Sequence, residues 1–215
     1  MIEFQNFGIS FGKLQVYKNL NLVIDDFSRV CLLGKSGCGK SILLKSILRN
    51  IEFTGKILIN GSEEYDKTRL ISTVYQDFCI LPWLSIYDNI KLCGATDNEI
   101  RKYANLLGIL SSLNKLPKEV SIGTKQRAAM VRALCSNKQI MLLDEPLCSV
   151  DEITASEIRK SLKKLTQEKT VLFVTHNIME ALEFADRIIV LNFGEIALDC
   201  PANSLTYDKI LSALL

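Results

Sequence analysis

The sequence predicts an α/β fold: one domain with a mostly parallel sheet core, N-terminal antiparallel β strands and an inserted helical subdomain. Two continuous apolar runs, 140–143 and 171–174, indicate central parallel strands, because such strands are buried on both faces. Short β-like runs separated by turn residues fill the first third of the chain. Between these parts the pattern becomes helical, which places the helical subdomain at about 77–135 of the single domain 1–215.

Turn residues mark the strands at the start of the chain. Gly12-Lys13 and Asp25-Asp26 separate the first three runs, and Asn60-Gly61 ends a fourth with a dipeptide typical of hairpins. The predicted strands are 2–4, 20–24, 29–33 and 56–59. In the helical subdomain one apolar helix face is expected from Leu106, Leu107, Ile109, Leu110 and Leu113.

The composition excludes several classes of protein. With 215 residues, 48% of them hydrophobic, the chain can bury a core, so disorder is not expected. The formal charge of +2 lacks the basic excess that is typical of nucleic-acid binding. The seven cysteines form no C-x-x-C pair, which disfavours a zinc site and indicates reduced thiols. Neither a signal peptide nor a membrane span is expected.

The strongest local motif is G-x-x-x-x-G-K-[ST] at 34–41, between the predicted strand 29–33 and an apolar helical pattern. Glycines let the backbone N–H groups of such a loop face phosphates, and the helix N-terminus adds its dipole. Lys40 is expected to reach the β- and γ-phosphates, and the Ser41 hydroxyl to ligate Mg²⁺. The motif predicts nucleotide binding by Gly34, Lys35, Ser36, Gly37, Cys38, Gly39, Lys40 and Ser41. Cys38 is expected to react with maleimides unless the loop shields it.

Two acids, Asp144 and Glu145, end the apolar strand 140–143. Adjacent acids at a buried strand end are costly unless they meet a cation or its water shell. Asp144 is therefore expected to hold the Mg²⁺ shell, and Glu145 to act as general base toward the attacking water. Strands also often end in acids at the solvent edge, so the pair indicates this chemistry only together with the phosphate loop.

His176, the only histidine, follows the strand 171–174 after one residue. A lone histidine is more often an ordinary surface or core residue. Its place after a parallel strand, however, is expected to direct it into the crevice where open α/β sheets bind ligands. There it can donate a hydrogen bond to the γ-phosphate.

These residues, in this order, resemble the ATP-binding cassette (ABC) ATPases, which are P-loop NTPases, over nearly the whole chain. The resemblance implies ATP and Mg²⁺ as cofactors, with Glu145, His176 and Gln76 in catalysis and Ser41, Gln76 and Asp144 at the metal. It also implies that Phe11 stacks on adenine and that Asp151 belongs to a D-loop at 147–151. The segments 74–77, 81–83 and 175–182 are similar to those of the nitrate, sulfonate, taurine and pyrimidine-precursor importers.

The resemblance further implies a head-to-tail dimer, in which Ser121 and Gly123 of one subunit complete the ATP site of the other. A homodimer is favoured, with a heterodimer as the alternative. The other expected partners are integral-membrane permease subunits, contacted through 78–84, and an extracytoplasmic solute-binding protein, with the chain at the cytoplasmic face of the cell membrane. Core packing is the alternative role of 78–84, and exposure of Trp83 distinguishes the two.

Two departures from the family pattern leave other functions open. The signature segment reads Val120-Ser121-Ile122-Gly123-Thr124, where most members have Leu-Ser-Gly-Gly-Gln. Ile122 is expected to disfavour a positive φ and to crowd the partner's ATP. Ile42 stands where a hydroxyl residue commonly contacts the α-phosphate, so one nucleotide contact is missing. The alternatives are a non-catalytic nucleotide-sensing subunit and an ABC-type ATPase that acts on nucleic acid or the ribosome.

Overall fold

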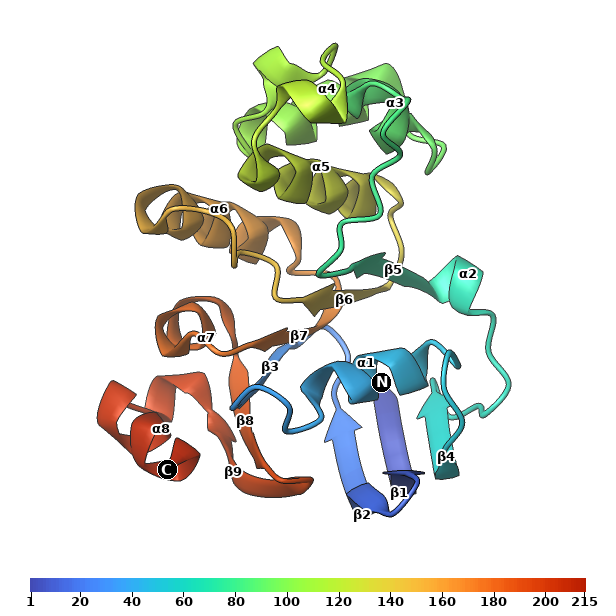
Figure 1. The fold of residues 1–215 in the computed structure, drawn as a ribbon, viewed down its shortest axis with the longest axis vertical. Coiled ribbons are helices and arrows are strands. Elements are labelled where there is room, and N and C mark those ends of the chain that lie inside the picture. Colours follow the sequence, from blue (N-terminus) through green and yellow to red (C-terminus); the bar gives the residue numbers. More distant parts are fainter.

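The computed structural model describes all 215 residues and contains two sheets (Figure 1). The larger sheet has the strand order β5-β6-β7-β3-β8-β9 and is parallel except for β9. Its strands are β3 (Arg29–Gly34), β5 (Ile71–Val74), β6 (Ile140–Asp144), β7 (Thr170–Thr175), β8 (Arg187–Asn192) and β9 (Glu195–Pro201). The two predicted apolar runs are β6 and β7, so the mostly parallel core is confirmed.

The smaller sheet is antiparallel, as the sequence predicts, with the strand order β2-β1-β4. Its strands are β1 (Ile2–Phe11), β2 (Leu14–Ile24) and β4 (Thr54–Ile59). The first two strands are longer than predicted and meet at the Gly12-Lys13 turn, where Gly12 has a φ of +59°. Register shifts within β1 disturb the alternation of apolar residues, which is why the sequence pattern shows only parts of these strands.

The parallel strands bury both of their faces, and neighbouring residues face different partners. Leu33, Leu143 and Phe173 belong to one hydrophobic core with the helices α5, α6 and α7. Leu32, Leu142 and the other alternate residues belong to a second core with α1 and the antiparallel sheet. These helices are α1 (Lys40–Ile47), α5 (Ile122–Cys135), α6 (Glu152–Leu165) and α7 (Ile178–Phe184). Two more, α2 (Lys67–Leu70) and α8 (Tyr207–Leu214), precede β5 and end the chain.

A group of helices between β5 and β6 gathers at the end of the molecule beyond the β5 edge (Figure 1). It consists of α3 (Ile86–Lys91), α4 (Asp97–Leu106) and α5. The apolar face predicted across 106–113 is wrong as one helix face, because α4 ends at Leu106 and Gly108 takes a φ of +65°. After this break Leu106 and Leu110 are exposed, whereas Leu107, Ile109 and Leu113 are buried.

The sheet order places three strand ends side by side. Since β6, β7 and β3 are neighbours and run parallel, their carboxyl ends at Asp144, Thr175 and Gly34 lie at one edge of the sheet. Ligands of open α/β sheets bind beyond this edge. No helix combines the length and the apolar character that crossing a bilayer requires.

Candidate nucleotide-binding and hydrolysis site

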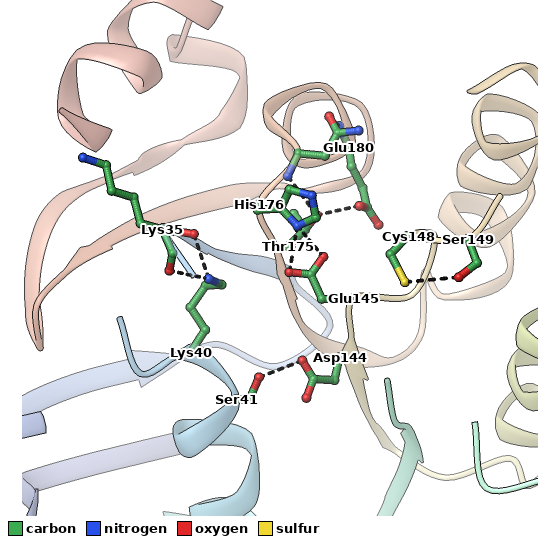
Figure 2. A network of polar contacts seen from close by, with 12 residues as sticks. Lys35, Lys40, Ser41, Asp144, Glu145, Cys148, Ser149, Thr175, His176 and Glu180 are labelled. Carbon is green, nitrogen blue, oxygen red and sulfur yellow. Dashed lines mark hydrogen bonds and ion pairs between the residues drawn. The ribbon is translucent and has the colours of Figure 1, made fainter. Parts of the chain in front are cut away.

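The loop 34–39 joins β3 to α1 and is folded around the side chain of Lys40. The buried Lys40 Nζ donates to the carbonyl oxygens of Gly34 at 2.7 Å and Lys35 at 3.0 Å (Figure 2). Gly37 and Gly39 have φ values of +80° and +105°, which L side chains rarely adopt. The ammonium group therefore lies at the loop itself, next to the unpaired N–H groups that begin α1.

Gly39 is required by its neighbours as well as by its φ. A Cβ at this position would lie 2.8 Å from the Tyr17 hydroxyl and 2.9 Å from Val16 Cγ1. The loop therefore packs directly against β2 of the antiparallel sheet. Cys38 is only 5% exposed, and a Cβ on Gly34 would lie 2.6 Å from its Sγ. The structure therefore favours a shielded thiol over the reactive one that the sequence predicts.

Asp144 lies opposite the start of α1. Ser41 Oγ donates to Asp144 Oδ1 over 2.9 Å, so two hard oxygen donors from distant parts of the chain meet (Figure 2). Burial raises the pKa of Asp144, and the hydrogen bond from Ser41 opposes that rise. A cation placed beside this carboxylate stabilises its partly buried negative charge.

Glu145 and His176 form a pair across the ends of β6 and β7. His176 Nδ1 lies 2.9 and 3.0 Å from the two carboxylate oxygens of Glu145, which makes this nitrogen the donor (Figure 2). Glu145 has a φ of +51°, and its N–H donates to the Val174 carbonyl at 3.0 Å. With this positive φ the chain turns away from β6 after Asp144. Such a backbone conformation is unfavourable for a residue other than glycine, and it occurs often at functional sites.

Gln126 is a site residue that the sequence analysis missed. It is fully buried in α5, and its Nε2 donates to the Glu145 carbonyl at 2.9 Å. Its Oε1 accepts from the Ser149 N–H at 3.2 Å. One side chain thus ties the helical group to the loop that follows β6. The sequence signal that could have identified Gln126 is a polar residue on the apolar face of a predicted helix.

These groups surround one open cavity of about 450 Å³. It is lined by Ser36, Gly37, Gly39, Lys40, Ser41, Ile42, Gln76, Glu145, Cys148 and His176. The structure therefore brings together the phosphate loop, Gln76 and the Glu145–His176 pair, which are far apart in the sequence. Phe11, at the end of β1 and half exposed, does not line this cavity, nor do Ser121, Gly123 and Asp151.

Comparison with known proteins agrees with this geometry. A family model described as ABC transporter matches residues 17–148, which is more than half of the chain and includes the phosphate loop and both acids. The chain belongs to the ABC transporter family. This confirms the resemblance inferred from the sequence, and the chain is an ATP-binding cassette ATPase.

Two curated ABC relatives and one solved structure cover most of the chain. The aliphatic sulfonates import ATP-binding protein SsuB of Zymomonas mobilis is 37% identical, over 88% of this chain and 81% of its own. The maltose/maltodextrin import ATP-binding protein MalK of Mannheimia succiniciproducens is 35% identical, over 91% of this chain and 56% of its own. The dimeric post-hydrolysis structure of the ATP-binding cassette MJ0796 with ADP and Pi is 31% identical, with a TM-score of 0.82, covering 94% of this chain and 99% of that one.

The ABC signature segment lies at the start of α5. Ser121 is the N-cap, and its Oγ accepts from the Thr124 N–H at 3.2 Å. Ile122 is the first helical residue and has no positive φ, so its backbone does not need the conformation that isoleucine disfavours. Its side chain is 59% exposed. Any crowding of a partner subunit at this position therefore comes from the bulk of the side chain and not from the backbone.

Gly123 and Asp151 have local roles that the structure explains. A Cβ on Gly123 would lie 3.0 Å from the Ser149 carbonyl oxygen, so glycine allows α5 to approach the loop after β6. Asp151 is the N-cap of α6 and accepts from the Thr154 N–H at 3.0 Å. Hydrogen bonds from Thr154 lower the pKa of Asp151.

The segment 78–84 divides between core and surface. Phe78 and Ile80 pack against the core, whereas Trp83 is 70% exposed. The buried Asn89 holds the loop, because its side chain accepts from the Leu81 N–H at 2.7 Å and donates to the Leu81 and Leu84 carbonyls. Trp83 is therefore presented at the surface by a fixed loop, the outcome that distinguishes docking from core packing.

Proposed function

We propose that the chain is the ATP-hydrolysing subunit of an ABC importer and couples ATP hydrolysis to solute uptake. The observation that supports this most directly is the single cavity that joins Lys40 and Ser41 of the phosphate loop to Glu145 and His176. The SsuB and MalK relatives are named as import ATP-binding proteins. Because these two serve different solutes, sulfonates and maltodextrins, the solute itself is left open.

Phosphate binding is proposed to redirect Lys40. In the structure its ammonium donates to two loop carbonyls, Gly34 and Lys35. Phosphate oxygens are charged acceptors and form stronger hydrogen bonds with a lysine than neutral carbonyls do. The loop N–H groups and the N-terminus of α1 add further donors. Ile42 lines the cavity without a polar group, and Phe11 is the proposed platform for adenine.

Glu145 is proposed to act as general base and His176 as the residue that orients it. In the structure Nδ1 of His176 donates to the Glu145 carboxylate, which fixes the carboxylate at the cavity wall. The carboxylate accepts the proton of the water that attacks the γ-phosphate. With Nδ1 engaged, a neutral His176 has an acceptor at Nε2, so donation to the γ-phosphate requires the imidazolium or a change of partner. Gln76 lines the same cavity.

The residues present fit a Mg²⁺ ion. Ser41 Oγ and Asp144 Oδ1 lie 2.9 Å apart, and Gln76 lines the same cavity as Ser41. Hydroxyl, carboxylate and amide oxygens are the hard donors that Mg²⁺ prefers. We propose that these three residues hold the ion, directly or through water. When bound, Mg²⁺ neutralises charge on the β- and γ-phosphates.

The assembly is proposed to be a homodimer bound to permease subunits at the cytoplasmic face of the membrane, with an extracytoplasmic solute-binding protein. A dimeric structure is known for the MJ0796 cassette. Ser121 and Gly123 lie outside the cavity of their own chain, which is consistent with their completing a partner's site. The exposed Trp83 offers the permease a fixed apolar contact.

ATP turnover of the full chain tests this function. It is measured alone, with the permease in lipid vesicles, and with single- or double-stranded nucleic acid. The proposal expects turnover that the permease stimulates and nucleic acid does not. ATP binding without turnover in all three conditions would indicate a nucleotide-sensing subunit. Stimulation by nucleic acid alone would indicate an ABC-type ATPase that acts on nucleic acid.

A further inference from the structure

Glu180 is a buried acid behind the hydrolytic pair. It lies on α7 and is 3% exposed. Thr175 Oγ1, at the end of β7, donates to its Oε2 over 2.7 Å (Figure 2). The other carboxyl oxygen, Oε1, is buried without a partner in the chain. An unpaired buried carboxyl oxygen is costly, so it requires either water or a proton.

A cavity connects Glu180 to the hydrolytic pair. It has a volume of about 130 Å³, and Glu145, His176, Arg159 and Glu180 all line it. The same Glu145 and His176 also line the larger cavity on the phosphate side. A polar cavity of this size has room for bound water, which makes hydrogen bonds to otherwise unpaired groups. Water here can bridge the Oε1 of Glu180 to Glu145.

The charged and titratable groups that face Glu180 come from four elements. They are Cys31 of β3, Glu145 and Cys148 after β6, Glu152 and Arg159 of α6, and His176 after β7. Burial raises the pKa of Glu180 to about 7, and Glu145 adds to the rise. The hydrogen bond from Thr175 and the charges of Arg159 and His176 oppose it. Near neutral pH Glu180 is therefore able both to accept and to release a proton.

We propose that Glu180 accepts the proton that ATP hydrolysis releases, through water in the cavity that it shares with Glu145. This inference rests on the proposed role of Glu145 as general base. As the water oxygen bonds to the γ-phosphorus and the bond to the β–γ bridging oxygen breaks, one water proton passes to Glu145. Glu145 then gives a proton to cavity water, and that water gives one to Glu180 Oε1. The carboxylate of Glu145 is restored, and Glu180 later loses its proton to solvent.

Glu180→Gln tests the proposal because the amide keeps the shape and the acceptor for Thr175 but cannot take a proton. We expect kcat for ATP hydrolysis by the full chain to fall about tenfold at pH 8, less than the roughly 10²- to 10⁴-fold effect of losing a general base, because Glu145 remains in place. The rise of kcat through pH 7 is also expected to disappear, while ATP affinity is unchanged. Because phosphate groups titrate in the same range, each profile is compared with that of the wild type. The control is Glu157→Gln, an exposed acid on α6 that does not line the cavity.

Thr175→Val is the second variant and separates a proton carrier from a structural residue. Loss of the hydroxyl removes a hydrogen bond that lowers the pKa of Glu180, so the rise of kcat is expected at higher pH. A wild-type midpoint in Thr175→Val, or a wild-type profile in Glu180→Gln, overturns the proposal. Glu145→Gln is measured in parallel. If Glu145→Gln abolishes turnover while Glu180→Gln is normal, only the role of Glu180 is wrong, whereas normal turnover in Glu145→Gln contradicts the proposed function itself.

Discussion

At the scale of single residues, the site is defined by side chains that are held by polar partners within the chain. Lys40 is held by two carbonyls, Ser41 by Asp144, and Glu145 by His176. Each of these side chains has a polar partner within the chain, so the fold itself supplies the contacts that position it. Preorganisation of this kind reduces the entropy lost on binding.

Glu145→Gln is expected to keep ATP binding and to lower hydrolysis by at least about 10²-fold, because the amide cannot accept the proton of the attacking water. Binding is measured by equilibrium titration and hydrolysis by phosphate release. Glu157→Gln, an exposed acid on α6, serves as the control and should behave as wild type. Near-normal phosphate release from Glu145→Gln would remove Glu145 from the role of general base.

Cys38 is expected to react with maleimide much more slowly than the exposed Cys79 and Cys148, because its sulfur lies beneath the phosphate loop. Mass spectrometry of peptides after timed labelling measures the three rates. Equal rates for Cys38 and Cys79 would mean that the loop opens readily in solution. ATP is then expected to slow the labelling of Cys38 if it closes the loop.

At the scale of elements, α5 joins the signature segment to the hydrolytic site. Its N-terminus carries Ser121 and Ile122, and its buried Gln126 bonds to the Glu145 carbonyl and the Ser149 N–H. The close contact of Gly123 with Ser149 adds a second link. The signature segment is thus linked to Glu145 through Gln126 and to Ser149 through both residues.

Ile122→Ala and Ile122→Gly are expected to raise ATP turnover of the assembled transporter alike, severalfold, on the order of 1 kcal/mol. The physical reason is that Ile122 has an ordinary helical backbone, so only its exposed side chain can crowd the partner's ATP. Steady-state phosphate release measures the effect. A rise in the glycine variant alone would restore the backbone explanation, and a fall in both would show that the interface uses isoleucine.

Gln126→Leu is expected to destabilise the chain by about 1–3 kcal/mol, since it leaves the Ser149 N–H without its partner and removes one of the donors to the Glu145 carbonyl. Urea denaturation measures the change. Lys125→Leu, at the neighbouring position of α5, is the control, because no side-chain bond to the site depends on it. If the two variants unfold at the same urea concentration, the link through Gln126 contributes nothing to stability.

At the scale of the whole molecule, the sheet order decides which residues meet. Neighbouring β3, β7 and β6 bring the phosphate loop, His176 and the acid pair to one edge, and α7 brings Glu180 behind them. The same packing buries Glu180, whose protonation then affects the stability of the fold. The direction in which stability changes with pH follows from this link between protonation of Glu180 and folding.

Stability is expected to fall as pH rises from about 4.5 to about 7, because burial raises the pKa of Glu180 from 4.5 to about 7. The folded state then binds the proton more tightly than the unfolded state, so the contribution is complete below pH 4.5 and is lost through pH 7. Its size is on the order of 3 kcal/mol. Urea denaturation at pH 5 and pH 8 should show this loss in wild type and in the exposed-acid control Glu157→Gln but not in Glu180→Gln.

The sequence by itself determined the fold class, the family and the phosphate loop. Apolar runs such as 140–143 and a complete loop motif at 34–41 are local signals, because burial on both faces and the glycine-rich turn both require particular neighbouring residues. The antiparallel strands were predicted only in part, because register shifts within β1 disturb the alternation of apolar residues. The helix break at Gly108 was not predicted, because a left-handed glycine interrupts the helical period.

Only the tertiary structure decided how distant residues pair. The meeting of Gln126 with Glu145, the helical backbone of Ile122, the burial of Cys38 and the cavity between Glu180 and His176 all depend on contacts between separate elements. No sequence period encodes such contacts, since each one arises from the order of strands in the sheet and the packing of helices upon it. Side-chain burial, and with it the pKa of Glu180, follows from that packing.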